Sequence, residues 1–435
     1  MERIFNWGIY PTIDAECTTL NAVDKVATYV RTTDAFIPRG NGRCYGDSAL
    51  QPKILSTLAL NKFLSFDTVN GIIKTEAGVL LSEILEVIVP KGFFLPVTPG
   101  TKFITMGGAV ASNIHGKNHH KDGAISQYIE CFDLMIESGE IVCCSRTENT
   151  EHFINTIGGM GLTGVVLTVT LRLKKIETSY INQKAIKAKN IHAILDYFEQ
   201  YQHYTYSVAW IDCLSKGDSL GRSILMLGEH ANVAELNTEQ SKQPLQLHSA
   251  KQIDVPFMFP AFALNELSIK AFNFLYYNKQ QQQEINNVVH YNPYFYPLDI
   301  LTNWNRIYGK NGFTQYQFAI PFENGREGLI KILTKIADSG CGSFLAVLKT
   351  FGKGDAFSSP LSFPIEGYTL ALDFKVSPKV FALLDELDKI VLEYGGRLYL
   401  TKDARMTSST FHQSYGIAFS HSTKFQSLQS NRLTI

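Results

Sequence analysis

The 435-residue sequence has no excess of either charge. Lysine and arginine together number 40, as do aspartate and glutamate, so the formal net charge is zero. A protein that binds nucleic acid through many phosphate contacts needs basic residues in excess, so no nucleic-acid partner is expected. No run of about 18 apolar residues could span a bilayer, and the first residues lack the apolar core of a secretory signal. We therefore expect a cytoplasmic protein.

Paired cysteines are also missing. The seven cysteines, at positions 17, 44, 131, 143, 144, 213 and 341, are odd in number and form no CxxC pair. This pattern is typical of reduced thiols rather than of a disulfide framework, and it provides no zinc site.

Two common nucleotide-binding motifs are absent as well. The chain has no GxxxxGK[ST], and no GxGxxG stands between a clear strand and a helix, which disfavours a P-loop and a nicotinamide-type Rossmann site. Three other glycine-rich stretches are present: RGNGRCYGDSAL (39–50), PGTKFITMGGAVASNIHGKNHH (99–120) and GGMGLTGVVLTV (158–169). Glycine lets backbone N–H groups approach an anion closely. One such loop could be a turn without a ligand, but three together predict one long ligand.

Short helical and short strand-like segments alternate along the chain, which predicts an α+β fold. LLSEILEVIVPKG reads as an amphipathic helix ending at Lys-Gly, and DLMIES with IVCCS as a hairpin turning at Gly139 and Glu140. Aromatic residues become more frequent after residue 180. The four glutamines of KQQQQEINN (279–287) predict a mobile surface loop.

The glycine-rich strings RGNGRCYGD, PGT, GGAVASNIHGKNHH and GGMGLTG resemble the FAD-binding domain of the vanillyl-alcohol-oxidase-type flavoproteins. HGKNHH and GGRLYLTKDAR are the more specific strings, and with FYPLD, QYQF and SFPI they resemble the decaprenylphosphoryl-β-D-ribose oxidase family over nearly the whole chain. The resemblance implies an FAD domain of two small α+β subdomains (1–179), a sheet-containing substrate domain (180–396) and a C-terminal segment that returns to the FAD domain (397–435).

The resemblance also implies the cofactor site. FAD is expected to bind non-covalently, because superfamily members that link it covalently often have a histidine where Arg43 stands. The residues expected to contact FAD are Arg39, Gly40, Asn41, Gly42, Arg43, Cys44, Tyr45, Gly46, Asp47, Gly100, Thr105, Met106, Gly107, Gly108, Ser112, Asn113, His115, Val166 and Tyr399.

The resemblance places the reacting end of the site around Lys402, which we expect to act as the catalytic residue with His115 and Lys117. A desolvated lysine can share a proton with an alcohol at neutral pH. The residues expected to bind substrate are Tyr45, Trp210, Tyr294, Gln315, Gln317, Lys349 and Lys402.

Simpler interpretations of these residues stay open. Lys402 could be a surface lysine, Gln315 and Gln317 could lie on a half-exposed strand without a ligand, and an aromatic residue in a strand usually belongs to the core. The three histidines of HGKNHH have no carboxylate or cysteine to complete a metal site, so none is expected.

The resemblance predicts an FAD-dependent oxidoreductase that oxidises a secondary hydroxyl of a sugar. The candidate substrate is a polyprenylphosphoryl ribose, a cell-wall precursor, oxidised at the ribosyl 2'-hydroxyl to a keto sugar. This would be the first half of an epimerisation that a separate NAD(P)H-dependent ketoreductase completes.

A lipid substrate would bring the protein to the inner face of the membrane as a peripheral protein, with the aromatic region 256–300 covering the lipid tail. Two alternatives remain at this stage: an alditol or aldonolactone oxidase that uses dioxygen, and a non-catalytic flavin- or lipid-binding protein.

Overall fold

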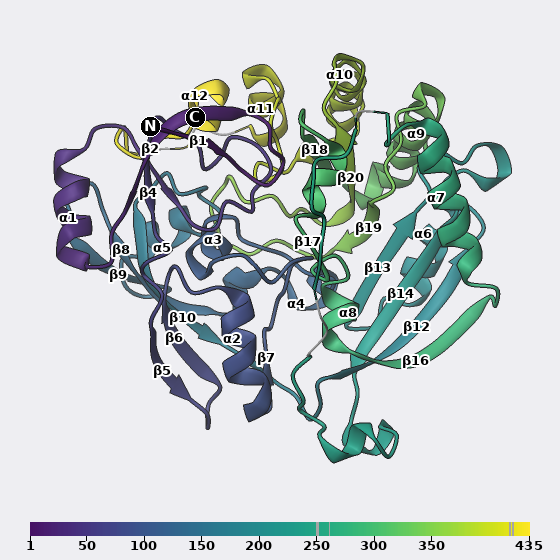
Figure 1. The fold of residues 1–435 in the computed structure, drawn as a ribbon, viewed down its shortest axis with the longest axis horizontal. Coiled ribbons are helices and arrows are strands. Elements are labelled where there is room, and N and C mark those ends of the chain that lie inside the picture. Colours follow the sequence, from purple (N-terminus) through teal and green to yellow (C-terminus); the bar gives the residue numbers. More distant parts are fainter. Residues whose placement is uncertain (249–251, 261, 417–418, 420–421) are drawn as a thin grey trace.

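A computed structural model describes residues 1–248, 252–260, 262–416, 419 and 422–435 (Figure 1). The chain begins with a four-stranded sheet in the order β1-β2-β4-β3, in which β2, β4 and β3 are parallel. Parallel neighbours require a crossover, and here a helix, α1, supplies one. These elements are β1 (Glu2–Phe5), β2 (Thr12–Thr19), α1 (Val23–Thr32), β3 (Ile37–Arg39) and β4 (Lys53–Ser56).

A second sheet follows, antiparallel throughout, in the order β5-β6-β10-β8-β9. The expected hairpin is confirmed: Met135 pairs with Ile141, and Gly139 at the turn has a φ of 79°, which favours glycine. The strands are β5 (Phe63–Asp67), β6 (Ile72–Glu76), β8 (Ile129–Met135), β9 (Ile141–Ser145) and β10 (Val165–Arg172), and the helices beside them are α2 (Leu81–Ile88) and α3 (Met106–Ala111).

The middle of the chain forms an eight-stranded antiparallel sheet in the order β16-β12-β14-β13-β19-β20-β18-β21. Figure 1 shows it beside the two N-terminal sheets. Its strands are β12 (Tyr180–Ala188), β13 (Tyr206–Ile211), β14 (Ser223–His230), β16 (Glu284–His290), β18 (Phe313–Pro321), β19 (Ala346–Phe351), β20 (Gly367–Lys375) and β21 (Arg397–Leu398).

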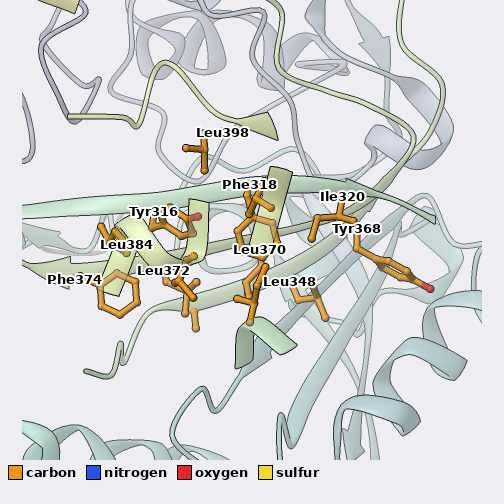
Figure 2. Close-up of a cluster of buried hydrophobic side chains, with 14 of the residues drawn as sticks. Tyr316, Phe318, Ile320, Leu348, Tyr368, Leu370, Leu372, Phe374, Leu384 and Leu398 are labelled. Atoms are coloured by element: carbon orange, nitrogen blue, oxygen red, sulfur yellow. The ribbon is translucent and has the colours of Figure 1, made fainter. Parts of the chain in front are cut away.

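Alternation along the strands gives this large sheet two different faces. Tyr316 pairs with Leu372 and Phe318 with Leu370, and Figure 2 shows these side chains in one buried apolar cluster with Leu384. Three helices cover this face: α6 (Ile191–Gln200), α9 (Phe322–Ser339) and α10 (Pro378–Glu393). Gln315 and Gln317 alternate with Tyr316 and Phe318 along β18, so their side chains point to the opposite face of the sheet.

The C-terminal segment joins the large sheet to the N-terminal one. It starts as the edge strand β21, continues through α11 (Ser408–Tyr415) and α12 (Leu428–Leu433), and lies beside the N-terminus in Figure 1. Phe425 forms a parallel bridge with Phe36. The Arg432 guanidinium pairs with Asp47 at 2.7 Å and with Asp403 at 2.8 Å, which ties the chain end to the first glycine loop.

The α+β prediction is confirmed by this mixture of helices and sheets. The predicted surface loop is confirmed for residues 281–283, which are exposed and belong to no helix or strand. The loop is shorter than the glutamine-rich composition suggested. Gln280 is 8% exposed, and its amide donates to the carbonyl oxygen of Ala185 at 3.1 Å, while Glu284 already begins edge strand β16. No helix in the described ranges is long and apolar enough to cross a membrane.

Candidate active site

A cavity of about 890 Å³ opens between the glycine-rich loops and the free face of the large sheet. This volume lies toward the upper end of the usual range for small-molecule sites, so it can hold a large ligand. Its walls come from residues 38–49, 98–117, 160–166 and 399–402, and from strands β13, β18, β19 and β20.

The first glycine loop presents an unpaired stretch of backbone to this cavity. No described residue accepts a hydrogen bond from the N–H groups of Gly40, Asn41, Gly42 or Arg43. Gly42 has a φ of 59°, a conformation that glycine adopts without strain. Successive free N–H groups in such a turn form a concave anion site, so the loop fits a diphosphate.

The two arginines of this loop differ in what they can bind. The Arg39 guanidinium donates to the carbonyl oxygen of Phe5 at 2.9 Å and to the Asn6 side chain at 3.2 Å, so it braces the loop. Arg43 lies 4.0 Å above the ring of Trp7, and its guanidinium has no hydrogen-bond acceptor among the described residues. Arg43 is therefore the cation available to an anionic ligand.

Strand register builds the opposite wall. Gln315 lies directly across from Asp373, Gln317 from Ala371, and Lys349 from Thr369, so these side chains share one face of the sheet. The Gln317 amide nitrogen lies 3.2 Å from Nε2 of His115 and 3.3 Å from the Thr369 hydroxyl. Polar side chains thus cross the middle of an otherwise apolar sheet.

Three lysines approach the cavity. Burial, together with the charge of Lys349, lowers the pKa of Lys117 to about 7. Burial, together with the charge of Lys402, lowers the pKa of Lys349 to about 7. Burial lowers the pKa of Lys402 to about 8, although the charge of Asp373 acts in the opposite direction. Such a group of amines favours an anionic ligand, which would relieve their mutual repulsion.

His115 is a neutral imidazole in this setting. Burial, followed by the charges of Lys349, His119 and Lys402, lowers its pKa well below the usual 6.5. Because Gln317 donates to Nε2, the ring proton belongs on Nδ1, which is buried without a partner among the described residues. Nδ1 of His115 therefore carries a proton that no described residue accepts.

Comparison with known proteins agrees with this geometry. A family model described as an FAD binding domain matches residues 11–145. Decaprenylphosphoryl-beta-D-ribose oxidase of Mycolicibacterium smegmatis is 34% identical over 95% of this chain and 91% of its own. The chain belongs to this oxidase family. As a member of it, the protein is an FAD-dependent oxidoreductase that acts on CH–OH groups.

Two further relatives define how far the likeness extends. The uncharacterized protein in the mprA 5' region of Streptomyces coelicolor is 30% identical over 75% of this chain and 90% of its own. L-gulonolactone oxidase of Bos taurus is 27% identical over 38% of this chain and 39% of its own. The chain therefore matches the oxidase family over nearly its full length and the lactone oxidase over a part.

Five of the residues expected in the site do not line the cavity: Gly46, Asp47, Met106, Asn113 and Tyr294. A Cβ at Gly46 would overlap the carbonyl oxygen of Asp403, and Asp47 pairs with Arg432, so both hold the loop to the C-terminal segment. Met106 is fully buried in the core. The other expected residues line the cavity, and their roles stay predictions.

Asn113 and Tyr294 lie one layer behind the wall. The Asn113 amide donates to the Ser362 hydroxyl at 2.9 Å, and its side-chain oxygen accepts from the backbone of Ser126. The Tyr294 ring lies 4.3 Å from the Lys117 ammonium, which donates to the Tyr294 carbonyl oxygen. These residues support the positions of their neighbours.

Asp373 does not line the cavity but lies directly behind its wall, and the sequence interpretation did not point to it. Its carboxylate accepts a hydrogen bond from the Gln315 amide at 2.6 Å, and its side chain is 1% exposed. A signal was present, since Asp373 is the one acidic residue within the apolar strand GYTLALDFK. Trp7, whose ring lies beneath Arg43, also lines the cavity, but no motif in the sequence points to it. Among the described residues, no group of three or more His, Cys, Asp or Glu side chains could hold a metal ion.

Proposed function

We propose that this protein oxidises the ribosyl 2'-hydroxyl of a polyprenylphosphoryl ribose to a ketone. The observation that carries this proposal is the set of three lysines with lowered pKa that line one cavity together with Gln315 and Gln317, in a chain of this oxidase family. A phosphorylated sugar supplies both the anion for the lysines and the hydroxyls for the amides. The experiment that tests it is anaerobic bleaching of the bound flavin by this class of lipid.

FAD is proposed to lie between two α+β subdomains, with its diphosphate on the free N–H groups of residues 40–43. This arrangement assigns residues 1–179 to the FAD domain, 180–396 to the substrate domain and 397–435 to the returning segment. When bound, FAD supplies the acceptor for the hydride of the alcohol.

The FAD is proposed to be held without a covalent bond. His115 is the histidine that lines the cavity within the described part of the chain, and its ring is already engaged by Gln317. Acid precipitation of the purified protein should therefore leave the flavin in the supernatant, measured by its absorbance. Flavin that stays with the pellet after washing would contradict this proposal.

Side chains of the protein are proposed to accept the proton, bind the substrate and balance negative charge. Lys402 takes up the proton of the alcohol, because an amine with a pKa of about 8 is partly neutral at physiological pH. Gln317 and Lys349 bind sugar or phosphate oxygens, with Gln315, Tyr45 and Trp210 completing the wall. His115 and Lys117 orient a hydroxyl or balance negative charge on the reduced cofactor.

The lipid tail has an apolar exit. Helix α7 (Glu266–Lys279) contributes Ile269, Phe272 and Tyr276 to the cavity, while its other side is open to solvent. Leu267, Phe274 and Leu275 on this open side are each more than half exposed, as are Phe257 and Phe262 in the residues before α7, and these five residues are called the apolar ridge below. We propose that this ridge rests on the membrane that holds the substrate.

Replacing Leu267 and Leu275 of the ridge together by serine should reduce binding to phospholipid vesicles by about tenfold or more. Burying each leucine in hydrocarbon contributes roughly 1.5–3 kcal/mol, so losing two matters even if insertion is partial. Co-sedimentation with vesicles measures the effect. The matched control is the double change Leu64→Ser and Val69→Ser, which alters exposed apolar residues of the β5–β6 hairpin. Equal loss in both variants would contradict a specific docking surface.

The keto sugar needs a second enzyme. Oxidation at this carbon followed by reduction from the other face inverts the centre, so an NAD(P)H-dependent ketoreductase is the proposed partner in the sequence of reactions. An alditol or aldonolactone oxidase that uses dioxygen is the second candidate, favoured by the partial match to L-gulonolactone oxidase. A flavin bleached by free polyols would select that candidate.

A further inference from the structure

Asp373 is a buried carboxylate beside the site. It lies on β20 directly opposite Gln315 of β18, and the Gln315 amide donates to its Oδ1 at 2.6 Å. Its other oxygen, Oδ2, is buried and has no hydrogen-bond partner among the described residues. A carboxylate in this environment requires a nearby cation or a proton of its own.

Lys402 is the cation whose charge acts on this carboxylate. The Lys402 ammonium lies 3.9 Å from the centre of the Tyr45 ring, and it donates no hydrogen bond to a described side chain. No direct ion pair joins Lys402 to Asp373, so their charges act on one another through space. The Tyr308 hydroxyl, also buried and without a described partner, belongs to the same neighbourhood.

The other titratable groups around this pair keep one charge state between about pH 6 and pH 9. Burial raises the pKa of the Cys44 thiol, and it raises those of Tyr45 and Tyr308 well above 10. Burial and neighbouring cations lower the pKa of His115 well below 6.5. These four groups stay neutral in this range.

Four groups remain that titrate in this range, one carboxyl and three amines. Burial raises the pKa of Asp373 to about 7, while Lys402, Lys349 and Lys117 have pKa values of about 8, 7 and 7. Burial disfavours the charged form of Lys402, and the negative charge of Asp373 favours it. The carboxylate therefore stabilises the ammonium that forms when Lys402 gains a proton.

We propose that Asp373 is a positioning residue for Lys402, whose buried carboxylate, aimed by Gln315, stabilises the ammonium that forms when Lys402 takes the proton of the alcohol. The O–H bond breaks and its proton joins the nitrogen lone pair of Lys402. The C–O bond becomes C=O as the hydrogen on the carbon that bears the hydroxyl is lost as hydride, for which bound FAD would be the oxidant. Asp373 touches neither substrate nor cofactor and acts through Lys402. The inference rests on the role of Lys402 in the proposed function.

The test is the pH dependence of acetylation of Lys402 by acetic anhydride in the holoenzyme, followed by mass spectrometry of the peptide that contains it. Only the neutral amine reacts, so the midpoint of the curve reports the pKa. Asp373→Asn removes the negative charge, which disfavours the ammonium and should lower the midpoint by about one pH unit or more. Gln315→Leu leaves Asp373 less able to ionise and should shift the midpoint in the same direction by less.

The matched control is Asp299→Asn, which removes another buried carboxylate, one that lines the cavity and whose charge acts on Arg43 and Lys102. It should leave the Lys402 midpoint unchanged. The flavin-reduction rate of Asp373→Asn should also show its pH limb at lower pH. An unchanged Lys402 midpoint in both Asp373→Asn and Gln315→Leu would overturn the inference. Because acetylation needs no substrate, this result is distinguishable from a wrong assignment of the substrate.

Discussion

Replacing Gly108 by leucine should give a folded protein that purifies without FAD. Gly108 lines the cavity on α3, and the one neighbour that a Cβ there would approach is the Thr105 hydroxyl, at 3.0 Å. A leucine side chain would therefore extend into the space proposed for the nucleotide without meeting a rigid part of the protein. The ratio of flavin to protein absorbance should fall to near zero, while far-ultraviolet circular dichroism should match that of the parent.

The choice of position matters for this experiment. At neighbouring Gly107 a Cβ would lie 3.0 Å from the Ala77 side chain and 3.2 Å from its carbonyl oxygen, so a change there would disturb the core as well. The matched control is Gly354→Leu, at an exposed glycine where the nearest atom to a new Cβ is 3.7 Å away. A Gly108→Leu protein with normal flavin content would refute the proposed path of the cofactor.

Lys402→Ala should retain FAD and slow its reduction by substrate about 10²-fold or more, the range typical for loss of a positioned acid or base. Lys402→Arg should not restore the rate, because a planar guanidinium with a high pKa cannot take up the proton. Anaerobic stopped-flow measurement at saturating substrate isolates this step. Lys353→Ala changes an exposed lysine just beyond β19 and should behave as the parent.

The pH profile separates a catalytic Lys402 from a merely structural one. The amine accepts a proton when it is neutral, so the reduction rate of the parent should rise with pH through a limb near 8. This limb should be missing from Lys402→Ala. Parent-like rates in both Lys402 variants would exclude the residue from the chemistry and direct attention to His115 and Lys117.

The sequence predicts that the glycine loops and Lys402 lie at the site, because each belongs to a short local motif that can be recognised without knowledge of the fold. The same strings cannot tell which members face the cavity. Met106 belongs to a string whose neighbours line the site, yet it packs into the core because a helix turns successive side chains to different sides. Gly46 packs against Asp403 and Asp47 pairs with Arg432, both in the C-terminal segment that returns to the first glycine loop.

The features that the sequence does not predict depend on which distant residues pair across the large sheet. Asp373 reaches the site because β18 and β20 pair with Gln315 opposite Asp373, a partner 58 residues away in sequence. A one-residue shift of that pairing would exchange the polar face and the apolar cluster of Figure 2. Gln280 and Gln283 also depend on pairing that the sequence does not show, since their side-chain amides donate to carbonyl groups of β12.

The substrate proposed for this FAD enzyme is a phosphorylated lipid sugar. The most direct test is to mix the yellow holoenzyme anaerobically with a polyprenylphosphoryl ribose, and separately with free ribose, an alditol and an aldonolactone, while recording flavin absorbance. We expect the lipid to bleach the flavin in one turnover with formation of a keto sugar, and the free compounds to leave it oxidised. Bleaching by the alditol or aldonolactone but not by the lipid would contradict the account.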